Sequence, residues 1–131
     1  MIPLPAKVYI ASKMQHAEKW RDLYNKSGLH IVSRWPFLEP FVEPTKNNAL
    51  KFWQDDVADI KNCDVLMIYA EENEHLRGAL VEVGLALGLG KYVVVIGDHP
   101  DFGTWRYHPR VYNLVDLDQA INFIRKKPWA A

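Results

Sequence analysis

The amino-acid sequence predicts an α/β fold: a three-layer α/β sandwich in which helices cover both faces of a five-stranded, mainly parallel sheet. Short runs rich in β-branched residues alternate with helical patterns along the whole chain. This alternation is typical of parallel strands joined by right-handed crossover helices. The length of 131 residues suits one hydrophobic core, so we predict a single domain over residues 1–131.

The first part of the chain contains two predicted strands separated by a helix. A strand over residues 7–12 (KVYIAS) precedes an amphipathic helix over residues 16–28, which ends at the stop signal Gly28. A second strand follows over residues 29–33. Three prolines in residues 34–48 then predict a long irregular loop, because proline lacks the N–H that regular structure needs.

The second part of the chain continues the alternation. A helix is predicted from about residue 48 to residue 62, and residues 63–70 (CDVLMIYA) predict a strand that is buried on both faces. The stretch RGALVEVGLALGLGK, residues 77–91, predicts a helix that leads into the next strand. The remaining predicted elements are a strand over residues 91–97, an irregular loop over 98–110, a short strand over 111–115 and a helix from about 117 to 127.

This order of elements predicts a flavodoxin-like or Rossmann-like sheet, in which ligands collect beyond the carboxyl ends of the strands, where the strand order reverses. Residues 9–13, 34–44, 71–77 and 97–110 should therefore share one rim. Two of these segments are long loops, and long loops in compact domains are usually functional or disordered. Their aromatic residues favour function, and these are Trp35, Phe37, Phe41, Phe102, Trp105 and Tyr107.

Glu82 is an unusual residue in its context, because it is an ionisable side chain on a helix that is apolar nearly all round. It falls one turn into that helix, where the helix dipole favours the anion by about 0.3 to 1 kcal/mol. Gly78, Ala79 and Ala86 on the same stripe are small and leave room for a ligand. The alternative is a structural carboxylate that caps the helix or pairs with Arg77.

Composition excludes several classes of partner. Sixteen basic and sixteen acidic residues balance, so no overall charge favours nucleic acid or an anionic membrane. Cys63 is the only cysteine in the sequence and is expected to be a buried residue at a strand edge. The N-terminus lacks the pattern of a signal peptide, and no run reaches the roughly 18 to 20 apolar residues of a membrane span. These features predict a soluble cytoplasmic protein.

Three stretches of the sequence resemble the nucleoside 2-deoxyribosyltransferase family and its relatives that hydrolyse nucleotide N-glycosidic bonds. They are VYIAS, DDVADIKNCDVLMIY and GALVEVGLALGLGKYVVVIG, which lie between Lys7 and Gly97. The resemblance implies that Glu82 is the nucleophile, that Asp56 helps to position the substrate and that Tyr9 lies beside the nucleophile. It also implies a homodimer or larger homo-oligomer in which a neighbouring subunit completes each pocket.

The sequence departs from the family pattern about six residues before the glutamate. Transferases of the family have a short acidic residue there and monophosphate hydrolases have a serine, whereas this chain has Leu76 between His75 and Arg77. Recognition of the sugar and of a phosphate therefore cannot be carried over from the family.

The chemistry of the residues agrees with cleavage of an N-glycosidic bond. A carboxylate stabilises the positive charge that develops on the sugar and then captures the sugar as a covalent intermediate. A second acid must protonate or hold the departing base, and Asp56 is the first candidate. The alternative is that Asp56 is an exposed helix residue beside Asp55 and Asp59.

Other residues are candidates for substrate binding. Ser12 and Lys13 follow the first strand and are placed to bind a phosphate, although a plain turn explains them as well. Trp35 and Trp105 are placed to sandwich a nucleobase, and packing in the loop core is the equal alternative. The remaining candidates are Arg77, Gly78 and His108.

No metal site or cofactor is predicted, because the five histidines have no metal-ligand spacing. Glu71, Glu72 and Glu74 are expected in a solvated loop. The sequence thus predicts an enzyme that acts on the N-glycosidic bond of a nucleoside, a nucleoside monophosphate or a related nucleotide. A nucleotide-sensing module without turnover and an NAD-cleaving glycohydrolase are the rival functions.

Overall fold

The computed structural model describes residues 5–38 and 45–129. Its sheet has five strands: β1 (Lys7–Ala11), β2 (His30–Ile31), β3 (Val65–Ile68), β4 (Tyr92–Ile96) and β5 (Val111–Leu114). The strand order is β2-β1-β3-β4-β5, and every neighbouring pair is parallel. The predicted fold class is therefore confirmed.

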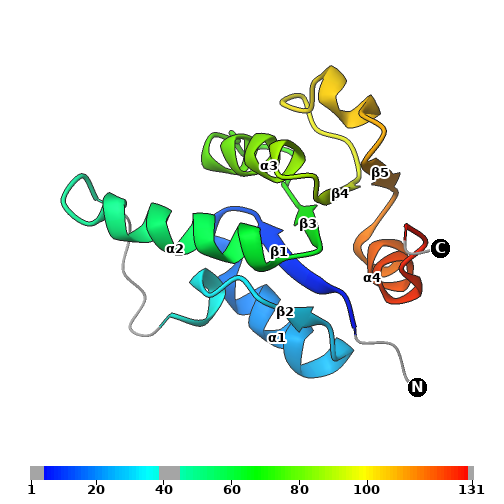
Figure 1. The fold of residues 1–131 in the computed structure, drawn as a ribbon, viewed down its shortest axis with the longest axis horizontal. Coiled ribbons are helices and arrows are strands. Elements are labelled where there is room, and N and C mark those ends of the chain that lie inside the picture. Colours follow the sequence, from blue (N-terminus) through cyan, green and yellow to red (C-terminus); the bar gives the residue numbers. More distant parts are fainter. Residues whose placement is uncertain (1–4, 39–44, 130–131) are drawn as a thin grey trace.

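Among the described residues, four α-helices cover the sheet: α1 (Ala17–Ser27), α2 (Ala49–Asn62), α3 (Gly78–Gly88) and α4 (Leu117–Lys126). Figure 1 shows α2 and α3 side by side on one side of the sheet, and α1 with α4 on the other. An Arg125 guanidinium hydrogen bond to the Ser27 carbonyl joins α4 to the end of α1. These positions follow from right-handed crossovers in this strand order.

The helix ends have local causes in the sequence. Gly28 ends α1 in the left-handed region, with φ of 70°, and its N–H donates to the Tyr24 carbonyl. Asp116 begins α4 by accepting a hydrogen bond from the Gln119 N–H at 2.9 Å. Both ends agree with the predicted boundaries to within one residue.

The core lies on both faces of the central strands. Every residue of β3 is buried, as predicted for a strand covered on both sides. Trp20 of α1 and Ile124 of α4 pack on one face, and Tyr9 of β1 points to the other. Cys63 is buried at the end of α2, as expected, and burial raises the pKa of its thiol to about 12. It is therefore a thiol at neutral pH and not a nucleophile.

The length predicted for the second strand and the irregular character predicted for the loop after it need correction. The second strand is only two residues long, and the first proline-containing loop is not wholly irregular, because Trp35–Phe37 forms the 3-10 helix η2. Pro36 fits there because the first turn of a helix needs no N–H from it. Residues 39–44 of that loop, including Phe41, lie outside the described residues. Two other short 3-10 helices are η1 (Met14–His16) and η3 (Thr104–Tyr107).

Pairing beyond the end of the short strand β2 uses one more backbone hydrogen bond, from the Val32 N–H to the Val8 carbonyl at 2.8 Å, and then side chains. The Ser33 hydroxyl accepts a hydrogen bond from the Ile10 N–H at 3.2 Å, and the Trp35 indole N–H donates to the Ile10 carbonyl at 2.8 Å. Both polar groups of the Ile10 backbone are thereby hydrogen-bonded beyond the end of β2.

Within the part of the chain that the structure describes, none of the helices has the length and apolar character of a membrane span.

Candidate active site

A pocket with a volume of about 280 Å³ opens at the carboxyl edge of the sheet, beside the ends of β1 and β3. This is the point where the strand order reverses, and the sequence predicted a ligand site there. Three segments form most of the wall, namely residues 12–14 after β1, the first half of α2, and residues 76–82 at the start of α3. Trp35 from η2 completes it.

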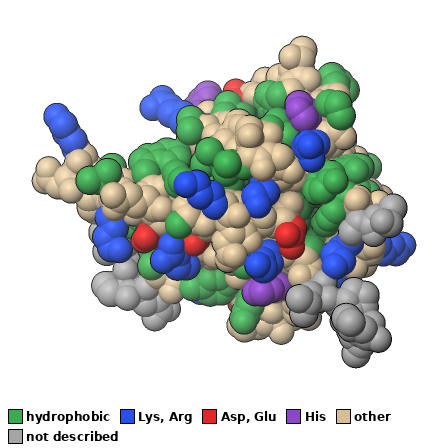
Figure 2. All heavy atoms as spheres, viewed as in Figure 1, with side chains coloured by type: hydrophobic (Ala, Val, Ile, Leu, Met, Phe, Trp, Pro, Cys, Tyr) green, Lys and Arg blue, Asp and Glu red, His purple; other side chains and the backbone are tan. Residues whose placement is uncertain are grey.

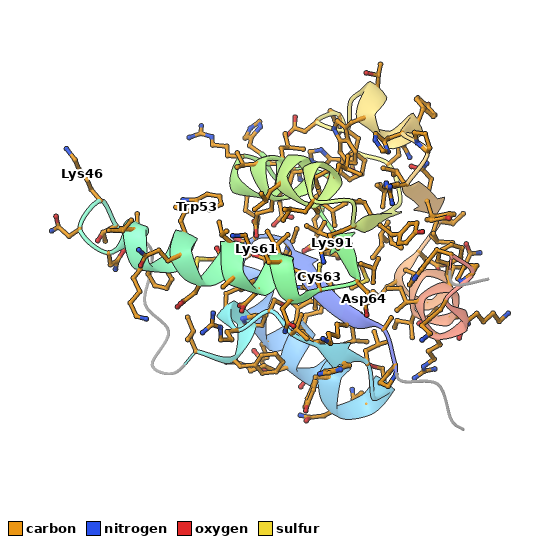
Figure 3. The ribbon with its side chains drawn as sticks, in the orientation of Figure 1. Lys46, Trp53, Lys61, Cys63, Asp64 and Lys91 are labelled. Carbon is orange, nitrogen blue, oxygen red and sulfur yellow. The ribbon has the colours of Figure 1, made fainter. Side chains whose placement is uncertain are left out.

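One face of α2 supplies a mostly apolar side of the pocket. Ala49, Phe52, Trp53 and Asp56 line it, and this spacing places all four on the same side of a helix. The Trp53 side chain lies on the side of α2 that faces α3 (Figure 3). Its ring is also close to Gly78, since a Cβ added at Gly78 would lie 3.9 Å from two of the ring carbons.

Glu82 lies at the inner end of the pocket and is buried. The hydroxyl of Tyr9, which comes from the middle of β1, donates a hydrogen bond to Glu82 Oε2. Tyr9 itself is fully buried beneath the pocket. Among the described ion pairs none joins Glu82 to Arg77, so the structural alternative of pairing with Arg77 is not observed.

Burial dominates the electrostatics of Glu82. It raises the pKa of the carboxyl to about 8, with a smaller rise from the nearby negative charge of Asp56, while the Tyr9 hydrogen bond lowers it. The helix dipole favours the anion by only about 1 kcal/mol, which is less than the cost of desolvating the carboxylate. Desolvation therefore outweighs the dipole, and the expected net preference for the anion is wrong. Burial also raises the pKa of Tyr9 well above its usual range, which keeps the phenol a hydrogen-bond donor.

Asp56 is the second carboxyl group of the pocket. Its pKa is raised to about 6, chiefly by burial and then by the charges of Asp59 and Asp55, while Tyr9 opposes the shift. It is half-buried and lines the pocket, so it is not the exposed helix residue of the alternative interpretation. The Tyr9 hydroxyl thus donates its hydrogen bond to Glu82 of α3, and the negative charge of Asp56 of α2 also acts on Tyr9 and raises its pKa.

An ion pair between the buried Asp59 and the exposed Arg34 fixes α2 to the segment that follows β2. Asp59 accepts hydrogen bonds from the Arg34 N–H at 3.0 Å and from Arg34 Nε at 2.9 Å. Because Asp59 lies less than one turn from Asp56 on the same helix, this pair helps to hold Asp56 at the pocket. Charge-assisted contacts of this kind are stronger than neutral hydrogen bonds.

The comparison that decides the family is a match of sequence. The profile of the family "nucleoside 2-deoxyribosyltransferase" matches residues 6–108. The chain belongs to the nucleoside 2-deoxyribosyltransferase family. The match covers most of the chain and includes Tyr9, Asp56 and Glu82. It confirms the predicted resemblance and the prediction of an enzyme of this family.

Two solved structures show that this member of the deoxyribosyltransferase family shares their fold. A 2-deoxyribosyltransferase from Bacillus psychrosaccharolyticus superposes with a TM-score of 0.65 at 19% sequence identity, over 95% of this chain and 94% of its own. A CMP N-glycosidase from Clostridium botulinum superposes with a TM-score of 0.52 at 18% identity, over 92% of this chain and 96% of its own. A search of curated protein sequences gives no significant match.

Most of the site residues predicted for a deoxyribosyltransferase-like protein lie together. The lining residues include Glu82 and Asp56, with Tyr9 directly below them. The predicted binding residues that line the same pocket are Ser12, Lys13, Trp35, Arg77 and Gly78. The Ser12 hydroxyl accepts a hydrogen bond from the Trp20 indole at 2.7 Å, and the buried Trp35 ring is held by Ile10.

Trp105 and His108 are not among the residues that line this pocket. Trp105 belongs to η3 and packs against Phe102, with 5.7 Å between ring centroids. His108 is exposed, and its Nδ1 accepts a hydrogen bond from the Arg110 N–H at 3.0 Å. The structure therefore does not bring Trp35 and Trp105 together as a sandwich within one chain.

Sequence reasoning missed several lining residues of this family member, namely Met14, Ala49, Phe52, Trp53 and Leu76. The helical spacing of Ala49, Phe52 and Trp53 with Asp56 was the available signal. This spacing places the three apolar side chains on the same face of the helix as Asp56.

Among the described residues no group of three or more His, Cys, Asp or Glu side chains is arranged to hold a metal ion.

Proposed function

We propose that this protein cleaves or transfers the glycosyl group at the N-glycosidic bond of a nucleoside or nucleoside 5'-monophosphate, with Glu82 as the nucleophile. The observation that carries the proposal is the arrangement of Glu82, Asp56 and Tyr9 around one pocket at the switch point of the sheet. Two carboxyl groups of unequal pKa in one site are typical of glycosidic bond cleavage.

Between the two pKa values the carboxyl groups share one proton. The pKa of about 8 for Glu82 and about 6 for Asp56 places this proton mainly on Glu82 in the free protein, so the reacting form is the minor one in which Glu82 is ionised and Asp56 is protonated. The Glu82 carboxylate attacks the anomeric carbon of the sugar, and the bond to the base breaks with its electron pair leaving on the base. Asp56 in its protonated form donates its proton to the departing base. Water or a second base then attacks the anomeric carbon, which releases Glu82, and the proton of water or of the incoming base returns to Asp56.

Aromatic side chains of α2 suit the base of such a substrate. Trp53 is 38% exposed, and it lines the pocket together with Phe52. Each base offers a flat face that stacks on such rings. Tyr9 keeps its proton and stabilises the Glu82 carboxylate by hydrogen bonding, which restrains the nucleophile in position.

The experiment that tests this function is incubation of the protein with a panel of nucleosides, nucleoside monophosphates and NAD, followed by chromatography of the free bases. Release of base from a nucleoside or its monophosphate supports the proposal, and added acceptor base separates transfer from hydrolysis. Binding without release would favour the sensing module. Release of nicotinamide from NAD alone would favour the NAD-cleaving enzyme.

The pH dependence of kcat/KM should be bell-shaped, with limbs near the pKa values of about 6 for Asp56 and about 8 for Glu82. Below the lower limb both groups are protonated and there is no nucleophile, and above the upper limb both are ionised and there is no acid. The limbs belong to the coupled pair. Initial rates measured from pH 5 to 10 check this, and a rate that is flat across both limbs would contradict it.

Arg77 and Lys13 are expected to favour a 5'-phosphate. Both side chains line the pocket, and a guanidinium binds phosphate through charge-assisted hydrogen bonds. Calorimetry should give a lower Kd for a nucleoside monophosphate than for its nucleoside. Arg77→Ala should reduce the ratio of these two Kd values about tenfold. Lys26→Ala, at the far end of α1, is the matched control. Equal affinities in the unmodified protein would refute the phosphate site.

A homodimer or larger homo-oligomer is expected from the surface of α3. This helix is apolar nearly all round, yet Val81 is 60% exposed and Leu89 is 41% exposed, and hydrophobic side chains reach the surface over α3 in Figure 2. Such helices are normally covered. Light scattering at assay concentration should show an assembly, and Val81→Glu should weaken it. A fully active monomer would rule the assembly out as part of the site.

A single domain over residues 1–131 and a cytoplasmic location stay predictions. So do the absence of a cofactor and the absence of nucleic acid among the partners.

A further inference from the structure

The loop between β3 and α3, residues 69–77, forms the wall of the pocket through Leu76 and Arg77. Polar side chains that do not line the pocket hold this β3–α3 loop from two sides. They are Glu74 from the loop itself, His16 and Gln15 from the segment after β1, and His99 with Asp101 from the segment after β4.

On one side, Glu74 ties the loop to η1. Its side chain is 9% exposed, so the expectation that it lies in a solvated loop is wrong. Glu74 Oε2 accepts from Gln15 Nε2 and pairs with His16 Nε2, both at 2.8 Å, while Oε1 accepts from the Glu71 N–H at 2.7 Å. These bonds connect the loop to the residues directly after Lys13 and Met14 of the pocket.

On the other side, His99 and Asp101 hold the loop by its backbone. Asp101 Oδ2 accepts from the Leu76 N–H at 2.8 Å, and His99 Nε2 contacts the Glu74 carbonyl at 2.7 Å. His99 Nδ1 accepts from the Asp101 N–H at 2.9 Å. This fixes the neutral imidazole with its proton on Nε2, donating to the carbonyl. His99 is 5% exposed, whereas the Asp101 side chain is 31% exposed.

The start of α3 has no side-chain cap of its own. Arg77 occupies the N-cap position without a capping hydrogen bond from its side chain. The Asp101 carboxylate at Leu76, one residue earlier, is therefore the nearest side chain that fixes the backbone of this wall. Glu82 lies one turn into the helix that begins at this wall. A shift of residues 76–78 therefore also changes the position of Glu82 relative to the substrate.

We infer that Asp101 is a positioning residue, which acts through the Leu76 amide to hold the substrate-binding wall at residues 76–78, with His99 orienting Asp101 and Glu74 holding the loop from its other side. The inference rests on the proposed function for its kinetic consequence. Asp101 does not touch the substrate, and its effect passes through the position of Leu76 and Arg77.

The experiment compares Asp101→Ala with Asp101→Asn in the full chain. Asparagine keeps an oxygen that can accept from the Leu76 N–H, whereas alanine removes the acceptor. Asp101→Ala should raise KM about tenfold with kcat within about threefold, because wall contacts contribute to substrate binding before the bond breaks. Asp101→Asn should restore KM to within about threefold of the unmodified protein.

A second measurement and a control separate positioning from loss of stability. Amide hydrogen exchange at Leu76 should be faster in Asp101→Ala and nearly unchanged in Asp101→Asn. Asp116→Ala also removes a carboxylate that accepts from one backbone N–H, that of Gln119 at 2.9 Å, but at α4, away from the pocket. It should lower thermal stability by a similar amount without changing KM.

Faster exchange at Leu76 with unchanged KM in Asp101→Ala would overturn the positioning role and leave the proposed function intact. The same KM increase in Asp116→Ala would also overturn it, because the effect would then reflect general stability. If the unmodified protein releases no base from any compound, the proposed function fails. Exchange at Leu76 then decides the role, and an unchanged rate in Asp101→Ala overturns it.

Discussion

Replacing Glu82 with glutamine should reduce base release by about 10⁴-fold, the usual scale for losing a central catalytic group. Glutamine keeps the size of the side chain and an oxygen that can accept the Tyr9 hydrogen bond, but it carries no negative charge to stabilise and capture the sugar. Folding and ligand binding should therefore survive. Initial rates with the best substrate of the panel measure the effect.

A covalent mechanism adds a chemical signature to the same experiment. A 2-fluoro sugar analogue should accumulate as an adduct on the peptide that contains Glu82, because fluorine destabilises the positive sugar in both steps of the reaction. Glu72→Gln, a matched change in an exposed residue of the β3–α3 loop, should leave rate and adduct unchanged. Near-normal base release by Glu82→Gln would reject Glu82 as the nucleophile.

The same substitution should make the protein more stable at neutral and alkaline pH. In the folded protein burial raises the pKa of Glu82 from 4.5 to about 8, whereas in the unfolded chain the group titrates near 4.5. Between these values the unfolded state has released a proton that the folded state retains, so stability falls as pH rises through this window. Across the whole window the free energy of unfolding falls by roughly 5 kcal/mol. The glutamine variant does not show this fall, because glutamine does not ionise.

Urea unfolding at several pH values measures this difference. Glu82→Gln and the unmodified protein should unfold at similar urea concentrations at pH 4, and the difference should grow up to about pH 8 and then level off. Glu72→Gln should follow the unmodified protein throughout. A glutamine variant that is less stable at pH 8 would show that the carboxyl group serves the fold, as the structural alternative for Glu82 requires.

Local patterns were sufficient to predict the fold. The buried run at residues 63–70 contains β3, and the alternation of strands and helices leaves few possible topologies. The length of β2 was not predictable in this way. Its pairing is completed by hydrogen bonds of the Ser33 and Trp35 side chains to the backbone of Ile10, which comes close to them only when the chain folds.

The site was predictable where a residue type was unusual for its setting. Glu82 was identifiable because a carboxylate on an apolar helix needs a reason, and the family resemblance then indicated Tyr9 and Asp56. Trp53 was not identified, because a tryptophan on an amphipathic helix is ordinary. The burial of Glu74 depends on partners far away in the sequence, such as His16, and a run of acidic residues carries no sign of them.

A short helical turn lies at each edge of the sheet, and we expect the two turns to restrict how copies of the protein can join. On one edge Trp35 of η2 occupies the Ile10 carbonyl beyond β2. On the other, Arg106 of η3 exchanges hydrogen bonds with the Asn113 side chain of β5, through its Nε and its carbonyl. Free strand edges are templates for fibril-like growth from chain to chain. We therefore expect an assembly of this protein to form through its helices, where a closed assembly can stop growing.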